Sequence, residues 1–165
     1  MNDTPSPLAR DLVTDVFGRS GCALYAEALG RSRSSLSRIV SKQSRTAALV
    51  LVKCELFRLA AGHGLFPEVL LRQPPPAIEL ADGETYVTYA LAHHFGEDGP
   101  LLIAEATGET RLSVASAMVR EEARFYPHYL RMVIVLDALH EAGADLRAAL
   151  TKARDKRIAW QVDTP

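Results

Sequence analysis

The sequence has little of what defines several large protein classes. Only two of its 165 residues are cysteine, Cys22 and Cys54, and neither has zinc-type partners nearby. Both lie in apolar periodic stretches, so we expect buried reduced thiols rather than a disulfide or a metal site. Uninterrupted aliphatic stretches such as Met132–Leu136 are far shorter than the roughly 20 residues that a membrane span needs. No basic-then-apolar signal pattern opens the chain, and we therefore expect a cytoplasmic protein.

Motifs of the common enzyme classes are missing as well. The chain has no Ser-His-Asp elbow, no glycine-rich loop of the type that binds phosphate and no pair of inward carboxylates. His93 and His94 have Glu97 and Asp98 nearby, but adjacent helical residues point about 100° apart, which disfavours a shared metal ion. We expect neither an enzyme nor a protein that holds a metal or another cofactor.

Helical periodicity is the main signal that the sequence does contain. Apolar residues recur at intervals of three and four through 8–17, 46–61 and 127–142, and no alternating strand pattern competes seriously. Glycines punctuate these stretches at the positions where helices end or turn. The predicted fold class is all-α.

A proline-rich segment divides the chain into halves of opposite charge. Residues 73–80 contain three successive prolines, which fix φ and remove backbone donors, so we predict a stiff connector. It separates a predicted N-terminal unit at 1–72 from a C-terminal unit at 81–165. Up to residue 76 the chain carries ten Lys and Arg against six Asp and Glu, and beyond it nine against fourteen. The basic half is the one that could meet phosphate.

The two halves are related in sequence at a shift of 78 residues. Ten of 24 positions are identical without a gap between 17–40 and 95–118, and glycines and a phenylalanine match along with alanines. A long apolar helix is predicted after each copy, at 46–61 and at 127–142, where the register slips by two or three residues. We interpret the chain as two tandem helical units.

The first copy of the repeat meets the demands of a helix-turn-helix at Cys22–Ser41. Ala26 is small enough for two helices to cross, and Gly30 suits a left-handed turn between them. The inward apolar positions are Tyr25, Leu29, Leu36 and Ile39. From Leu29 to Ile39 the chain resembles the lambda-repressor-like helix-turn-helix superfamily of phage and bacterial regulators. It departs from the pattern at Arg31, where an aliphatic residue is usual.

The resemblance implies that the second helix of this segment reads DNA in the major groove. Arg33 and Arg38 face outward on that helix, and a guanidinium offers two parallel donors to guanine. The predicted DNA-binding residues are Arg31, Ser32, Arg33, Ser34, Ser37, Arg38, Ser41, Lys42, Gln43 and Arg45. We expect a sequence-specific, repressor-like regulator of the phage or plasmid type. It would bind double-stranded DNA as a homodimer, with half-sites roughly 34 Å apart.

The second copy keeps the frame of the first but changes its outward residues. Ala104 matches the crossing residue, Gly108 the turn, and Ile103 and Val114 the inner face, whereas the outward positions are mostly apolar. We predict that three of them lie at a dimer, inter-domain or partner contact, because an apolar outer face is best explained by a covering surface. They are Leu112, Ala115 and Val119. The alternative is a second reader of A·T-rich DNA through thymine methyl groups.

Two other functions compete with transcriptional regulation. One is a helix-turn-helix-derived module or anti-activator that binds another protein and no DNA, which the acidic second half favours. The other is the small subunit of a viral DNA-packaging machine, which also pairs such a motif with oligomerising helices.

Overall fold

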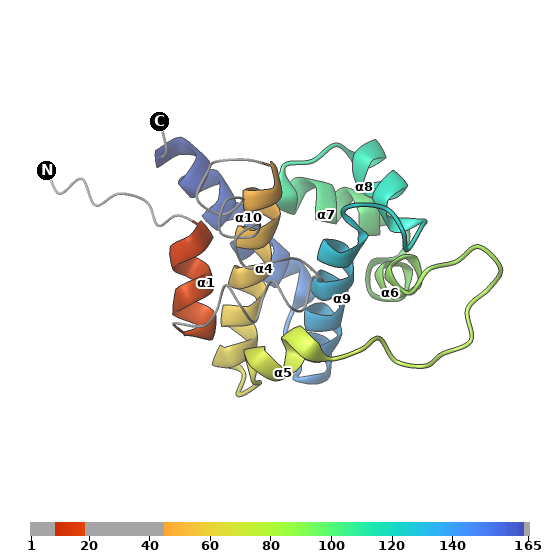
Figure 1. Cartoon of the computed structure of the whole chain (residues 1–165), viewed down its shortest axis with the longest axis horizontal. Helices are drawn as coiled ribbons and strands as arrows, with labels where there is room; N and C mark the ends of the chain where they lie inside the picture. The colour runs from red at the N-terminus through yellow and green to blue at the C-terminus, as the bar shows by residue number, and fades with distance from the viewer. Residues whose placement is uncertain (1–8, 19–44, 164–165) are drawn as a thin grey trace, which may run out of the picture.

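The computed structural model of the chain describes residues 9–18 and 45–163 (Figure 1). Every regular element within these ranges is a helix, which confirms the predicted all-α fold class. The elements in chain order are α1 (Ala9–Phe17), α4 (Arg45–Gly62), α5 (Pro67–Arg72), α6 (Tyr86–Phe95), the 3-10 helix η1 (Gly96–Asp98), α7 (Gly99–Thr107), α8 (Arg111–Met118), α9 (Tyr126–Glu141) and α10 (Leu146–Asp163). The helices predicted at 46–61 and 127–142 are α4 and α9, to within one residue at each end.

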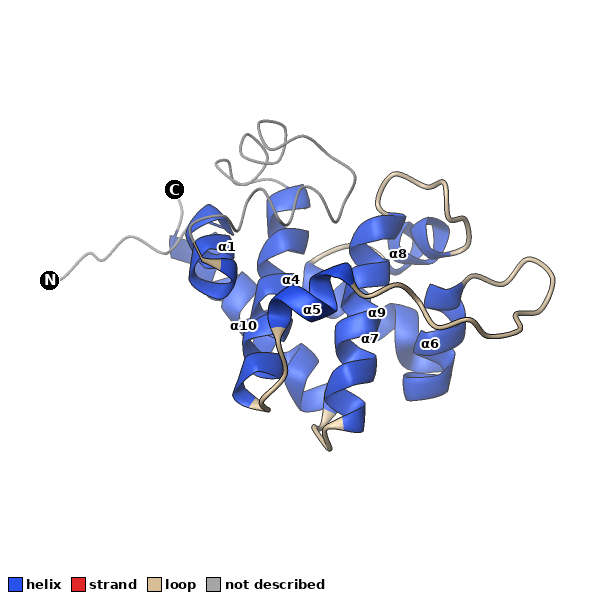
Figure 2. Ribbon diagram, turned by 60° about the horizontal axis from the view of Figure 1, so that its bottom comes forward, coloured by secondary structure: helices blue, strands red, loops and turns tan. Residues whose placement is uncertain are grey.

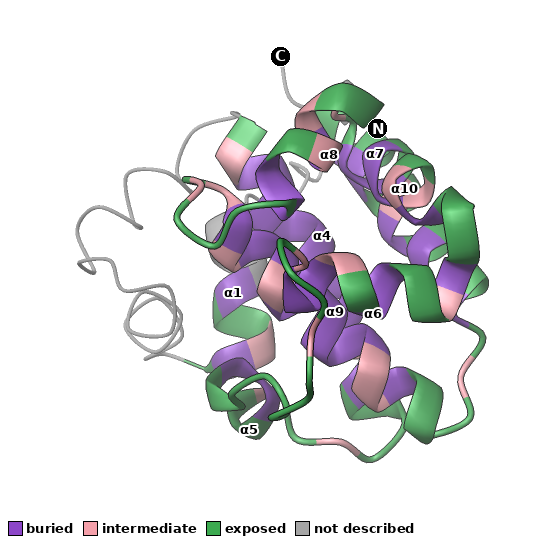
Figure 3. Ribbon diagram, turned by 90° about the vertical axis from the view of Figure 1, so that its right-hand side faces the viewer, coloured by how far each residue is buried: buried purple, intermediate pink, exposed green. Residues whose placement is uncertain are grey.

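Helix α4 lies at the centre of the fold because its sequence is apolar on nearly every face. Each residue from Ala47 to Phe57 is buried, and α1, α9 and α10 pack around it. Figure 3 shows α4 and α9 largely in the colour of buried residues. Burying one large aliphatic or aromatic side chain stabilises a fold by about 1.5–3 kcal/mol, so α4 supplies much of the driving force. Cys54 is buried in this helix, as predicted, whereas Cys22 lies outside the described residues.

Two charged side chains of α4 are buried, and each has a partner. Lys53 is fully buried, and its Nζ lies 2.5 Å from Nδ1 of His128 in α9. Glu55 is nearly as buried and forms an ion pair with Arg58, Nη1 to Oε2 3.6 Å. Buried charges are tolerated only when such partners compensate for lost hydration.

Both halves of the chain contribute to one hydrophobic core. A continuous cluster of buried residues extends from Val13 in α1 to Trp160 in α10. Helix α4 of the first half packs against both α9 and α10 of the second. Residues 73–81 carry no regular secondary structure and form part of the long loop between α5 and α6 (Figure 2).

The helices that follow the two copies of the repeat, α4 and α9, end in the same backbone conformation. Helix α4 ends in a turn at Gly64, with φ +80°, and the N–H of Leu65 donates to the carbonyl of Ala60 at 3.0 Å. Helix α9 ends in the same turn 79 residues later. There Gly143 has φ +84°, and Ala144 donates to Leu139 at 2.9 Å. Both ends are Schellman motifs, in which glycine takes the left-handed conformation that other residues avoid.

Two buried arginines satisfy the carbonyl groups at the ends of helices. Nη1 of Arg131 in α9 donates to the carbonyls of Leu70, Leu71 and Gln73, at 3.1, 2.9 and 2.7 Å. Arg157 in α10 donates to the carbonyls of Glu105 and Ala106 near the end of α7. The last carbonyls of a helix lack partners within the helix, so these arginines fix α5 and α7 to the core.

Candidate functional site

Helices α7 and α8 form a short helix, a three-residue turn and a second short helix, which we name the α7–α8 pair. Gly108 begins the turn in the left-handed conformation, φ 77° and ψ 12°, and its N–H donates to the carbonyl of Ala104 at 2.9 Å. The Thr110 hydroxyl caps α8 by accepting from the N–H of Ser113 at 3.1 Å. Ile103, Ala104 and Val114 are buried, so the inward positions expected from the sequence face the core.

The outer side of the α7–α8 pair presents apolar residues to solvent. Leu112 is 77% exposed and Val119 is 49% exposed, whereas Ala115 is partly buried. Arg111 and Ser116 are also exposed on α8. Within the described structure, Leu112 therefore contributes little to the chain's own packing, and about half of Val119 also remains open to solvent.

A shallow hollow of about 430 Å³ lies beside α8 and gathers arginines. Its lining includes Arg45, Arg120 and Arg124 together with Ser113 and Ser116. The sequence reasoning missed Arg120 and Arg124 because they occupy the turn after α8, outside the repeated positions. The same turn also contains two acidic residues, Glu121 and Glu122. The surface is therefore mixed in charge rather than strongly basic.

Arg45 is the one predicted DNA-binding residue in the described part of the chain. Its Nε forms a close ion pair with Oε1 of Glu109, and its guanidinium lies 4.6 Å from the centre of the Phe125 ring. Burial raises the pKa of the neighbouring Tyr129 to about 12, and Glu109 adds to this rise while Arg45 opposes it. A DNA phosphate at Arg45 would compete with Glu109 for the guanidinium. The other predicted DNA-binding residues, Arg31, Ser32, Arg33, Ser34, Ser37, Arg38, Ser41, Lys42 and Gln43, lie outside the described residues.

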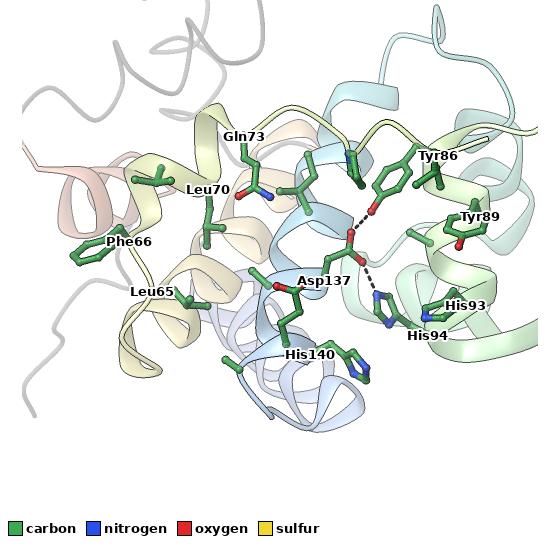
Figure 4. Close-up of a pocket in the computed structure, with 18 of the residues that line it drawn as sticks. Leu65, Phe66, Leu70, Gln73, Tyr86, Tyr89, His93, His94, Asp137 and His140 are labelled. Carbon is green, nitrogen blue, oxygen red and sulfur yellow. Dashed lines mark hydrogen bonds and ion pairs between the residues drawn. The ribbon is translucent and has the colours of Figure 1, made fainter. Parts of the chain in front are cut away.

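A larger pocket, of about 730 Å³, lies on another side of the fold (Figure 4). One wall comes from residues 64–78, which include α5 and the start of the proline-rich segment, and the other from α6 and α9. Asp137 of α9 reaches into it, with both carboxylate oxygens engaged. His94 Nε2 donates to Oδ1 at 2.5 Å, and the Tyr86 hydroxyl donates to Oδ2. Burial and the bond to Asp137 raise the pKa of Tyr86, which keeps its hydroxyl a donor.

The sequence contains only a weak signal for this pocket. His93 and His94 are adjacent in the sequence, but their side chains have different contacts in the structure. His94 contacts Asp137, whereas His93 stacks on Tyr89 with ring centres 6.1 Å apart. Asp137 stands out as the one acidic residue between Tyr126 and His140, directly after the apolar run Met132–Leu136. Among the described residues no group of His, Cys, Asp and Glu has a geometry that could hold a metal ion.

Comparison of the chain with protein-family models, with curated proteins and with solved structures gives no match. The resemblance to the lambda-repressor-like superfamily therefore depends on the sequence pattern alone. No helix in the described ranges is long and apolar enough to cross a membrane.

Proposed function

We propose that the protein is a sequence-specific DNA-binding regulator of the repressor type. The observation that carries the proposal is the geometry of the α7–α8 pair, which is the described copy of a repeated sequence. Its left-handed glycine turn, capped second helix and buried inner positions are those that a helix-turn-helix requires. The first copy shares these residue types and lies in the more basic half of the chain, where phosphate attraction favours DNA.

In this proposal Arg33 and Arg38 read bases from the outward side of the second helix. Their matches in the second copy are Arg111 and Ser116, and both are exposed on α8. Ser32 matches Thr110, which caps that helix. The outward positions of the described copy thus support the choice of reading residues in the first. Arg45, whose guanidinium is engaged by Glu109, is expected to contribute less than the sequence alone indicated.

The first test is a fluorescence titration of labelled DNA from upstream of the coding sequence. Replacing Arg38 with alanine should weaken specific binding by about 1–3 kcal/mol, because a bidentate contact to guanine is lost. Ser116→Ala, at the matching position of the second copy, is the control and should leave affinity unchanged. Equal affinity of wild type and the Arg38 variant would show that Arg38 does not read DNA.

A second candidate function is a module that binds another protein and no DNA. The exposure of Leu112 and Val119 favours it, because large apolar side chains on an outer face commonly mark a protein contact. The same residues fit the DNA-binding proposal if they meet in a homodimer. Absence of any DNA affinity in the wild-type titration would favour the protein-binding module.

The homodimer is tested by sedimentation of Leu112→Asp. The wild type should sediment with the mass of two chains and the variant with the mass of one, because a buried aspartate at the contact would lack a partner. Leu112 is largely exposed within the chain, so the fold itself should be unaffected. Thr151→Asp adds the same charge at an exposed position of α10, outside the α7–α8 pair, and serves as the control. An unchanged mass together with lost DNA affinity would instead identify α8 as a second DNA reader.

A further inference from the structure

The pocket between α5, α6 and α9 has the size of a small-molecule site. Its volume of about 730 Å³ lies within the range of roughly 300–1,000 Å³ that is usual for ligand pockets. Residues from both halves of the chain line it, so a bound molecule would contact both. Arg131 holds one of the walls in place through its bonds to the carbonyls of Leu70, Leu71 and Gln73. The site is therefore formed by the fold in the absence of a ligand.

The charge of the lining selects for a cation. Apart from tyrosines and histidines, the ionisable residues that line the pocket are Asp137 and Glu141, both acidic, and no Lys or Arg is among the lining residues. The Asp137 carboxylate is held by Tyr86 and His94 and keeps 26% of its side chain exposed. A carboxylate oxygen that already accepts one hydrogen bond can accept another, so a ligand can still bind to it.

The remaining lining residues favour a ligand whose uncharged part is apolar or aromatic. Tyr89 and His93 present a stacked pair of rings on α6, and the aliphatic side chains of Leu65, Val69 and Leu70 line the other wall. Figure 4 shows Leu65 on the side of α5 and Tyr86, Tyr89 and His93 on the side of α6, with the ring of Phe66 at the outer edge and turned away from Asp137. Aromatic faces attract organic cations that lie within about 6 Å of the ring centre.

We propose that this pocket binds an organic cation with an aromatic or apolar body, with Asp137 as its counter-ion. The proposal does not depend on DNA binding, because it uses none of the residues assigned to that function. The cationic group would lie against Asp137 and Glu141, and the apolar or aromatic part against the rings of α6. An anion of the same shape would be repelled by the two carboxylates.

The test is a calorimetric titration of the full chain with tryptamine and, in parallel, with indole-3-propionate. The two probes share the indole ring and differ in the sign of their charge at neutral pH. Tryptamine should bind at least tenfold more tightly than indole-3-propionate. Asp137→Asn, which keeps an oxygen to accept from Tyr86, should reduce tryptamine affinity at least tenfold. Glu105→Gln, on the exposed side of α7, is the control and should have no effect.

A second variant separates loss of charge from damage to the pocket. Ala138→Leu lies in the lining and keeps both acids, so it should weaken both probes by filling part of the space. Equal binding of the two probes, or unchanged tryptamine binding by Asp137→Asn, would overturn the proposal. Failure of tryptamine to bind the wild type would overturn it as well, and would leave the DNA titration unaffected.

Discussion

Replacing Gly108 with valine is expected to lower the free energy of unfolding by about 2–5 kcal/mol. Two effects combine at this position. The backbone has φ +77°, which a β-branched residue strongly disfavours. A Cβ atom would also lie 2.8 Å from Nη1 of Arg157, the residue that holds the end of α7. Urea unfolding of the variant and the wild type measures the loss.

Gly83 provides a matched control for the two effects. It has the same φ, +77°, but a Cβ atom there would meet nothing within 4 Å. Gly83→Val should therefore show the backbone strain alone and cost less than Gly108→Val. An equal loss in the two variants would mean that contact with Arg157 is unimportant. An unchanged melting temperature for Gly108→Val would contradict the left-handed turn itself, and with it the reason for expecting the matching turn at Gly30.

Replacing Arg131 with leucine is expected to destabilise the fold by about 2–4 kcal/mol. The substitution keeps a buried apolar stem but removes the donor to three carbonyls at the end of α5. The three carbonyls would lose the guanidinium as a hydrogen-bond donor in a partly buried environment. Because α5 also forms one wall of the large pocket, the same variant should bind tryptamine more weakly than the wild type. Urea unfolding and the calorimetric titration give the two readouts.

Arg147 is the matched control for Arg131. It is also an arginine on a helix, but it is more than half exposed and forms an ion pair with the exposed Asp98 at 3.3 Å. Exposed pairs contribute roughly 0–1 kcal/mol, so Arg147→Leu should change stability little. A loss for Arg131→Leu no larger than that for Arg147→Leu would show that the three carbonyl contacts do not stabilise the protein.

Local features of the fold were predictable because they depend on residues close in sequence. Apolar spacing of three and four placed α4 and α9 to within a residue at each end. Gly108 was expected in a left-handed turn because its neighbours matched the pattern around Gly30, and its φ is positive. The buried positions Ile103 and Val114 follow from the helical period in the same way.

Features that depend on tertiary packing were not predictable from the sequence. Two units were expected on either side of residues 73–80, yet α4 packs against both α9 and α10, so the halves share a core. Arg45 was assigned to DNA because it follows the predicted reading helix, but it pairs with Glu109, which lies 64 residues further along. Asp137 and His94 are 43 residues apart, and only the packing of α6 on α9 brings them together.

The central claim is that the first copy of the repeat reads DNA and the second does not. Arg33 and Arg111 occupy matching positions in the two copies, so the pair Arg33→Ala and Arg111→Ala tests the claim within one experiment. The measurement is a fluorescence titration of the labelled upstream duplex at one fixed salt concentration. We predict that the wild type binds it specifically, that Arg33→Ala loses about 1–3 kcal/mol of binding free energy, and that Arg111→Ala loses none. Absence of wild-type binding, or equal losses in the two variants, would contradict the account.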